Sequence, residues 1–328
     1  MKNQTFLVTG AAGFIGSRFV HSCQNKPKVQ IISADHLEHF KNRPEHAEIR
    51  FEKTIDRLQL FEWLKNEKPA ISAIFHLGAC TDTTESDGKY LTKMNLEYSI
   101  TLWTYATKNK IPFIYASSAA TYGNGETGYD DDEKLLPELK PLNLYGESKQ
   151  LFDLWALEQE SKGFHPPTWA GFKFFNVYGL GERHKRTTKA NMSSVVLQAF
   201  DQIQANEKMR LFKSHRTGIA DGHQKRDFIF VDDVVDVLHF AVHQPIRRGI
   251  FNLGTGQART FLDLVRAVFQ SLGKPEKIEF MDTPQNIREH YQYFTEAKMD
   301  RLRKVGYTQP FTSLEKGVRK YIQELINR

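Results

Sequence analysis

A tyrosine and a lysine four residues apart, Tyr145 and Lys149, are the side chains of this sequence best suited to chemistry. On a helix, residues at this spacing share one face and lie one turn apart. A free tyrosine titrates near about pH 10, which is too high for a base at neutral pH. A neighbouring ammonium would stabilise the phenolate and lower the pKa of Tyr145. The pair therefore predicts a tyrosine that exchanges a proton with a substrate hydroxyl.

This spacing is common on its own, and its ordinary interpretation is a half-buried aromatic residue beside a solvated lysine. The order of the surrounding motifs favours chemistry instead. A glycine-rich segment at residues 9–16 comes first, and the pair Ser117-Ser118 then closes an apolar run at residues 111–116. Tyr145 follows about twenty-five residues later. This order predicts a dinucleotide site followed by a reacting Ser-Tyr-Lys set.

Short apolar runs alternate with longer helical patterns in the first half of the chain. The expected strands lie at residues 5–8, 29–32, 71–75 and 111–116, and the first helix lies at residues 14–24. Such alternation is typical of βαβ units, so we predict an α/β fold with a doubly wound parallel sheet of the Rossmann type.

The second half of the chain has a less regular pattern and should form a smaller lobe. Helices are expected at residues 192–205, 232–242, 261–272 and 314–326, and a strand at residues 249–253. We expect a dinucleotide-binding domain at residues 1–175 and a substrate-binding domain at residues 176–328. Segments near residues 225–255 should return to the first domain.

The glycine triplet Gly10-x-x-Gly13-x-x-Gly16 lies directly after a predicted strand and directly before a predicted helix. Glycine permits the tight turn there and lets the backbone approach a pyrophosphate, which the helix N-terminus also attracts. Asp35 follows the second strand, where an acid bonds the ribose hydroxyls of NAD. Three basic residues close behind could instead hold a 2′-phosphate: Lys41, Lys53 and Arg57. The choice between NAD and NADP stays open.

Bulk properties exclude several classes of protein. The 328 residues have a net charge of +6, and basic residues are scattered among acids, so no nucleic-acid footprint is expected. Cys23 and Cys80 are the only cysteines, without metal-ligand spacing, which argues against a disulfide framework or a zinc site and for a reducing cytoplasm. No run is apolar enough to anchor in a membrane. The acidic run at residues 130–134 is expected to be an exposed loop, not a metal cluster.

Further runs span nearly the whole chain: residues 78–84, 87–90, 115–123, 174–179, 225–228, 251–256 and 291–295. On these runs the sequence resembles the extended short-chain dehydrogenase/reductases, and within them the ADP-L-glycero-D-manno-heptose 6-epimerase family. The glycine loop and the Asn-Val-Tyr-Gly run are shared by the superfamily. The Ala-Cys-Thr-Asp-Thr-Thr and Tyr-Gln-Tyr-Phe-Thr runs point to the heptose epimerases.

The resemblance implies a redox-neutral inversion at C6 of ADP-D-glycero-D-manno-heptose. Hydride would pass transiently to bound NADP, with NAD as the alternative cofactor. Ser118 would hydrogen-bond the reacting oxygen, while Ser117 would face the packed interior. Tyr145 would handle the proton on one face of the carbonyl intermediate, and Lys149 would also hold the nicotinamide ribose.

In this family, a second lysine handles the proton on the other face of the carbonyl intermediate. Lys185, nine residues beyond Asn176 in a His-Lys pair, has the expected upstream spacing. Four additional residues, 186–189, separate it from the run that begins at Met192, and counting backward from Met192 selects Lys189 instead. We favour Lys185. The alternative is that either lysine only contacts the substrate phosphates.

The resemblance also implies the binding residues. Cofactor contacts would come from Gly10, Gly13, Phe14, Ile15, Gly16, Asp35, His36, Lys41, Leu77, Gly78, Ala79, Cys80, Asn95, Tyr145, Lys149, Val177 and Lys185. Substrate contacts would come from Ser118, Asn176, Asn191, Phe212, Lys213, Ser214, His215, Arg226 and Tyr291. Arg226 suits a diphosphate, although an ion pair with Asp227 or Asp233 is the alternative, and Tyr291 could be a core aromatic residue. A small nucleotide sugar is the expected partner, in a homo-oligomer without metal.

Three other functions compete with this one. A UDP-sugar 4-epimerase would share the Ser-Tyr-Lys set. A 4,6-dehydratase is less favoured because it needs an additional acid to expel water, and residues 118–122 offer none. A non-catalytic dinucleotide-binding sensor is disfavoured by the intact set of Ser118, Tyr145 and Lys149.

Overall fold

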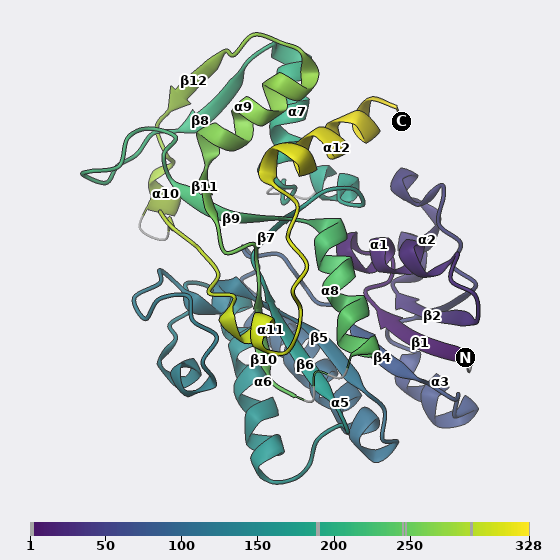
Figure 1. The fold of residues 1–328 in the computed structure, drawn as a ribbon. Coiled ribbons are helices and arrows are strands. Elements are labelled where there is room, and N and C mark those ends of the chain that lie inside the picture. Colours follow the sequence, from purple (N-terminus) through teal and green to yellow (C-terminus); the bar gives the residue numbers. More distant parts are fainter. Residues whose placement is uncertain (1–2, 188–190, 245, 247, 289–290, 328) are drawn as a thin grey trace.

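The central feature of the fold is a seven-stranded parallel sheet in the order β10-β6-β5-β4-β1-β2-β3 (Figure 1). This computed structural model describes residues 3–187, 191–244, 246, 248–288 and 291–327. The strands are β1 (Gln4–Thr9), β2 (Val29–Asp35), β3 (Lys53–Asp56), β4 (Ala73–His76), β5 (Phe113–Ser118), β6 (Trp169–Phe174) and β10 (Ile250–Leu253). The chain winds outward in both directions from β1 and β4, which confirms the doubly wound sheet.

Helices cover both faces of this sheet, which explains its nearly continuous apolar strands. On one face α1 (Phe14–Cys23) packs against α8 (Val231–His243), and Phe19 lies 4.1 Å from Phe75 between ring centroids. On the other face lie α5 (Tyr98–Lys108) and α6 (Leu144–Ser161), where Trp103 packs against Trp169. Shorter helices are α2 (Leu37–Lys41), α3 (Leu60–Glu67) and α4 (Gly88–Leu91).

A second lobe is built around two small sheets. One joins β11 (Ala258–Thr260), β9 (Lys225–Phe230) and β7 (Asn176–Tyr178), and the other joins β12 (Ile278–Met281) and β8 (Met209–Phe212). Its helices are α7 (Val195–Asn206), α9 (Phe261–Leu272), α10 (Gln285–Arg288), α11 (Asp300–Lys304) and α12 (Leu314–Ile326). Apolar faces of α7, α9 and α12 form a separate core.

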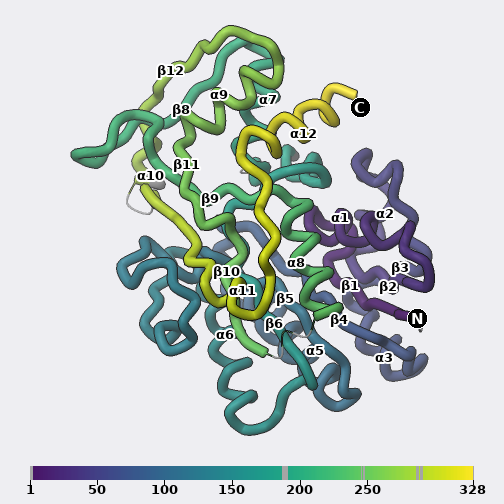
Figure 2. The backbone as a smooth tube through the Cα atoms, in the orientation of Figure 1, coloured from purple at the N-terminus to yellow at the C-terminus, as the bar shows by residue number. Residues whose placement is uncertain are grey.

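The chain crosses between the lobes more than once. In Figure 2 the backbone returns from the second lobe to β10, which pairs with β6 in the central sheet. The boundary between two domains near residue 175 stays a prediction. Two later elements, α8 and β10, lie with the first lobe. Within the described residues, no helix has the length and apolar character needed to cross a membrane.

The acidic run at residues 130–134 differs from expectation. Asp131 is 1% exposed and accepts a hydrogen bond of 2.8 Å from the backbone N–H of Asn252. Glu133 accepts one of 3.0 Å from the N–H of Ile250 and pairs with Arg301. The prediction of an exposed loop is confirmed for Asp132 and Lys134 but wrong for Asp131 and Glu133, because these two acids bind the start of β10, a partner more than a hundred residues away in sequence.

Candidate active site

The glycine loop between β1 and α1 is a cradle that side chains would fill. Gly10 has φ +66°, and a Cβ there would lie 2.6 Å from the Cα of Gly78. A Cβ on Gly16 would lie 2.0 Å from the carbonyl oxygen of Gly10. Gly13 precedes α1 without a side-chain cap, and the first turn of α1 has no acidic residue. These features leave backbone N–H groups for an anion and fit the pyrophosphate of a dinucleotide.

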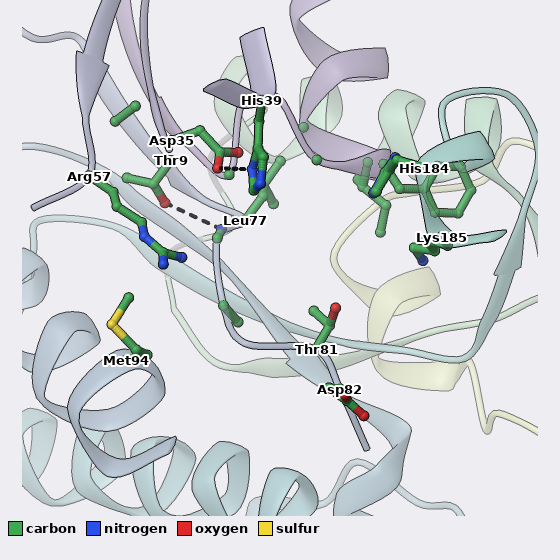
Figure 3. Close-up of a pocket in the computed structure, with 18 of the residues that line it drawn as sticks. Thr9, Asp35, His39, Arg57, Leu77, Thr81, Asp82, Met94, His184 and Lys185 are labelled. Carbon is green, nitrogen blue, oxygen red and sulfur yellow. Dashed lines mark hydrogen bonds and ion pairs between the residues drawn. The ribbon is translucent and has the colours of Figure 1, made fainter. Parts of the chain in front are cut away.

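A cavity of about 290 Å³ opens beside this loop at the carboxyl ends of β1, β2 and β4. It is lined by Thr9, Gly10, Gly13, Phe14, Ile15, Gly16, Ala34, Asp35, His39, Arg43, Arg57, Leu77, Gly78, Ala79, Thr81, Asp82, Met94, Tyr98, His184, Lys185 and Met192. Figure 3 shows Asp35 and Arg57 on one side of this cavity and His184 and Lys185 on the other. The cavity lies where the strand order reverses, which is the usual position of a ligand in an open α/β sheet.

Asp35 lies at the end of β2 and holds the surrounding backbone. Its carboxylate accepts hydrogen bonds from the N–H of Ala12 at 3.0 Å and of His36 at 2.7 Å, and it contacts His39 at 3.1 Å. Burial alone would raise the pKa of Asp35, but these hydrogen bonds and nearby cations lower it overall. Asp35 is therefore a carboxylate at neutral pH with three donors from the protein around it.

Two arginines flank Asp35 in the cavity. Arg43 donates a hydrogen bond to the carbonyl oxygen of Ala12 in the glycine loop. Burial lowers the pKa of Arg43, while Asp35 and Glu45 raise it. The Nε of Arg57 is buried without a hydrogen-bond partner among the described residues. This pair of cations beside Asp35 can hold an anionic group at the adenosine end of a dinucleotide.

Other predicted residues of this region lie outside the cavity lining. His36 is exposed and caps α2 by accepting from the N–H of Glu38. Lys41 is exposed and pairs with Glu38 at 3.5 Å. Lys53 lies over the ring of Trp63 at 4.5 Å. Arg43, which the sequence analysis missed, takes the place expected of Lys41. Its signal was a second basic residue two positions further along the same run.

The loop after β4 lines part of the cavity, and hydrogen bonds from Asn95 hold its backbone. This loop lines the cavity at residues 77–79 and again at Thr81 and Asp82, whereas Cys80 between them does not line it. Asn95 is 1% exposed and binds both backbone groups of Cys80, at 2.8 and 3.0 Å. Asn95 thus positions the loop instead of lining the cavity.

Ser118, Tyr145 and Lys149 come together where β5 ends and α6 begins. Asn143 caps α6 by accepting from the N–H of Gly146 at 2.8 Å. Gly146 lets α6 approach closely, since a Cβ there would lie 2.8 Å from the carbonyl oxygen of Ala120. The Ser118 hydroxyl is hydrogen-bonded to the Tyr145 phenol. The Ser118–Tyr145 contact of the predicted set is therefore present, with Tyr145 half-buried.

The electrostatics of this set differ from expectation. Burial raises the pKa of Tyr145, and the hydrogen bond with Ser118 offsets only part of that rise. Lys149 donates instead to the carbonyl oxygen of Ala116 at 2.9 Å, and burial lowers the pKa of Lys149 to about 8. The prediction that Lys149 lowers the phenol pKa is wrong in this structure. Tyr145 is a neutral phenol that donates or relays a proton.

Ser117 points away from this set, as expected. It donates to Asp153 at 2.7 Å, and Asp153 also pairs with the fully buried Lys173 at 2.9 Å. This buried network joins β5, α6 and β6 and gives Ser118 a rigid base.

Lys185 reaches the cavity from the other lobe. It lies in a short 3₁₀ turn, Arg183–Thr187, and its Nζ lies 4.6 Å from the ring centre of Phe14. Burial lowers the pKa of Lys185, while the nearby Glu182 raises it and Arg43 lowers it further. A lysine with a lowered pKa can exchange protons nearer neutral pH. Lys189, the alternative from the sequence, lies outside the described residues.

Glu182 is the fully buried acid beside Lys185. Its carboxylate accepts from the N–H and the hydroxyl of Ser194, both at 2.6 Å, and from the N–H of Gly179 at 3.3 Å. Burial raises the pKa of Glu182, and the charge of Lys185 is the largest influence lowering it. Sequence reasoning did not single out Glu182, since one acid after a glycine turn has no distinctive spacing.

Part of the predicted substrate set gathers around Arg226. The guanidinium lies between the rings of Phe261 and Tyr291, at 5.5 and 5.6 Å, and donates to the carbonyl oxygens of Lys225 and Gln292. Phe212 lies 6.2 Å from Tyr291. The alternative of an ion pair is excluded: Asp227 binds the turn at Thr255, and Asp233 binds Thr312.

The remaining predicted substrate residues are more dispersed. Lys213 pairs with Asp282 at 3.5 Å, and Ser214 donates to the carbonyl oxygen of Arg216. The ring of His215 accepts from the N–H of Thr283 at 3.2 Å. Asn176 is exposed at the start of β7 and Val177 follows it, half-buried. Asn191 precedes α7, has φ +43° and accepts a hydrogen bond from the Ser193 hydroxyl.

A doubly wound parallel sheet with a glycine loop at its switch point and a Ser-Tyr-Lys set beside it defines the class of extended short-chain dehydrogenase/reductases. Within that class, the chain belongs to the NAD dependent epimerase/dehydratase family, which matches residues 6–254.

Three known proteins illustrate the similarity. An ADP-L-glycero-D-manno-heptose-6-epimerase from Fusobacterium nucleatum is 42% identical over 330 residues, covering 98% of this chain and 97% of that protein. The crystal structure of the Helicobacter pylori ADP-L-glycero-D-manno-heptose-6-epimerase has a TM-score of 0.80 and 27% identity, covering 100% and 97%. The Thermus thermophilus UDP-glucose 4-epimerase in complex with NAD has a TM-score of 0.77 and 21% identity, covering 98% and 99%. This last similarity shows the fold alone.

Proposed function

We propose that the protein inverts C6 of a nucleotide sugar, converting ADP-D-glycero-D-manno-heptose to ADP-L-glycero-D-manno-heptose. The observation that carries this proposal is that Lys185, a second candidate for proton handling, lines the cavity beside the glycine loop and belongs to a different lobe than the Ser118–Tyr145 pair. Inversion needs groups on both faces of a planar carbonyl, whereas one-directional oxidation needs only one. The names of relatives at 42% identity support the same substrate.

The reaction is balanced without an external oxidant. A bound nicotinamide would accept the C6 hydrogen as hydride and later return it to the opposite face. Lys185, or Tyr145 once it has relayed its own proton onward, takes the hydroxyl proton as the C6 carbonyl forms, and the other group gives a proton to the oxygen as the C6 alcohol forms again. The Ser118 hydroxyl hydrogen-bonds this oxygen in the carbonyl state. Substrate and product therefore have the same oxidation state.

The cofactor form that we propose is NADP. Asp35 already accepts hydrogen bonds from Ala12 and His36, so it is engaged in holding the backbone. Arg43 and Arg57 line the adjacent part of the cavity and can pair with a 2′-phosphate. The Arg43→Ala variant should weaken NADP binding by about tenfold or more, and NAD binding much less. The exposed Lys41→Ala variant is the matched control. Equal losses for both dinucleotides in Arg43→Ala would favour NAD.

The substrate is tested by incubating the purified protein with either ADP-heptose epimer and with UDP-galactose, and following the products by NMR. We expect interconversion of the ADP-heptoses and no turnover of UDP-galactose. Turnover of UDP-galactose alone would make the protein a UDP-sugar 4-epimerase. Turnover of neither sugar, with dinucleotide bound, would support a non-catalytic sensor.

We further propose that the protein acts in the cytoplasm as a homo-oligomer and needs no metal. No group of three or more His, Cys, Asp or Glu side chains in the described parts of the chain is arranged to hold a metal ion. Activity should therefore survive dialysis against a chelator. Loss of activity that a divalent cation restores would contradict the metal-free mechanism.

A further inference from the structure

A carboxylate, Glu45, connects the adenosine end of the cavity to the segment that carries Lys185. Glu45 lies in the short turn Pro44–His46, directly after Arg43 and its proline. Its Oε1 accepts from the backbone N–H of His184 at 3.0 Å and contacts Nδ1 of the same residue at 2.7 Å. One carboxylate oxygen therefore fixes both the peptide and the ring of the residue next to Lys185.

The electrostatics of this contact favour a permanent hydrogen bond over a titrating ion pair. Burial would raise the pKa of Glu45, but hydrogen bonds from His184 bring it down to about 2. Burial lowers the pKa of His184 despite the neighbouring carboxylate. At neutral pH Glu45 is ionised and His184 is neutral, so its Nδ1–H donates to the carboxylate. The contact selects one tautomer and one ring orientation.

Lys185 is held on the opposite side by Glu182. Its backbone N–H donates to the carbonyl oxygen of Glu182 at 2.9 Å, and Glu182 is bound to Ser194 at the start of α7. The contact between Glu182 and Ser194 fixes the start of the short turn Arg183–Thr187. Glu45 fixes His184, the residue before Lys185. Both contacts are needed to define where the ammonium meets the cavity.

We propose that Glu45 is a positioning residue for Lys185, acting through His184. The inference rests on the proposed function, because it takes Lys185 as the second proton-handling group. The turn that bears Glu45 also bears Arg43, so one structural unit contacts the adenosine end of the cavity and orients the second base. A displacement of about 1 Å in a catalytic group can cost about a hundredfold in rate. Glu45 touches neither reacting atom and acts only through geometry.

The test compares three substitutions at one position. Glu45→Ala removes both hydrogen bonds to His184, and we expect kcat to fall by about tenfold to a hundredfold while KM and bound dinucleotide are unchanged. Glu45→Gln keeps an acceptor oxygen at the same reach and should recover most of that loss. Glu45→Asp keeps the charge but loses the reach, so it should behave like Glu45→Ala. Glu38→Ala, at an exposed acid on α2, is the matched control.

A double variant separates this inference from the proposed function. Lys185→Met is expected to keep only the half-reaction that forms reduced nicotinamide. If Glu45 acts through Lys185, adding Glu45→Ala to Lys185→Met causes no further loss in that residual formation of reduced nicotinamide. An equal additional loss in that background, or Glu45→Asp more active than Glu45→Gln, would overturn the positioning role. A kcat of Glu45→Ala equal to that of the Glu38→Ala control would also overturn the positioning role. Near-normal turnover of Lys185→Met alone would instead overturn the second base, and with it the proposed function of Lys185.

Discussion

Tyr145 lies on the first turn of α6 with its phenol bound to Ser118, and the surrounding protein keeps it protonated. A neutral phenol suits the return step, in which the carbonyl oxygen needs a proton. The lowered pKa of Lys149 places a second exchangeable proton one helical turn away. At the residue scale, the site is therefore built to pass a proton between groups, with burial as the dominant influence on each pKa.

Replacing Tyr145 by Phe removes the proton-handling oxygen and keeps the ring. We expect turnover to fall by at least about a hundredfold, the lower range for a general acid–base group, with dinucleotide still bound. Steady-state rates and the nucleotide content of the purified variant measure both effects. Near-normal turnover would contradict the assignment of Tyr145.

Lys185→Met removes the group that would serve the other face of the carbonyl. Epimerisation should be abolished, yet reduced nicotinamide should still form from one of the two ADP-heptose epimers, because Tyr145 can take the hydroxyl proton while it relays its own proton onward. Stopped-flow absorbance of the reduced nicotinamide, started from each epimer separately, measures this asymmetry.

Lys189→Met provides the comparison for that variant and should be milder. An inactive Lys189→Met beside a near-normal Lys185→Met would show that the chain aligns backward from Met192. Full activity in both Lys185→Met and Lys189→Met would contradict the two-base mechanism itself.

At the scale of elements, the β1–α1 turn depends on close backbone contacts at Gly10, Gly13 and Gly16. A Cβ on Gly16 would overlap the carbonyl oxygen of Gly10, so the helix would have to move away from the strand. The same turn directs the N–H groups at the start of α1 toward the cavity.

The Gly16→Ala variant tests this element. Overpacking of this kind costs about 1–3 kcal/mol, and we expect a lower melting temperature together with loss of most co-purified dinucleotide. Gly88→Ala is the control, since a Cβ there meets only the Leu144 side chain at 3.9 Å. Full dinucleotide content in Gly16→Ala would contradict the cradle.

At the scale of the whole molecule, two buried histidines, His46 and His76, and the half-buried His239 make the fold sensitive to acid. Burial lowers the pKa of His46 to about 4, of His76 to about 3 and of His239 to about 4. Their ordinary value is 6.5. Between these values the unfolded chain binds more protons than the folded one. Stability is therefore fully present above about pH 6.5 and declines as the pH falls toward 3 to 4.

Urea unfolding between pH 7.5 and 5 should show this decline, with each such histidine contributing up to ~1.4 kcal/mol per pH unit. His76→Gln removes one of these proton-binding sites and should make the dependence shallower. His223→Gln, at an exposed histidine, should leave it unchanged. An equal slope in His76→Gln and the parent protein would contradict the contribution of His76.

Local sequence signals determined much of the architecture. The glycine triplet, the alternation of apolar runs and the Tyr-x-x-x-Lys spacing act over a few residues, so they predicted the parallel sheet, the cradle and the juxtaposition of Ser118 with Tyr145. Element ends were also close: the helix expected at residues 192–205 begins at Val195 because Ser194 caps it. The relatives confirm the epimerase family that the longer runs indicated.

Tertiary structure alone decided the contacts between residues distant in sequence. Arg43 approaches the glycine loop, Glu45 meets His184 from 139 positions away, and Asp131 is buried against β10. It also set the protonation of Tyr145, since the pKa depends on burial and on where the Lys149 ammonium points. The physical reason is that periodicity and turn chemistry act along the chain, whereas desolvation and long-range hydrogen bonds exist only once the lobes have packed.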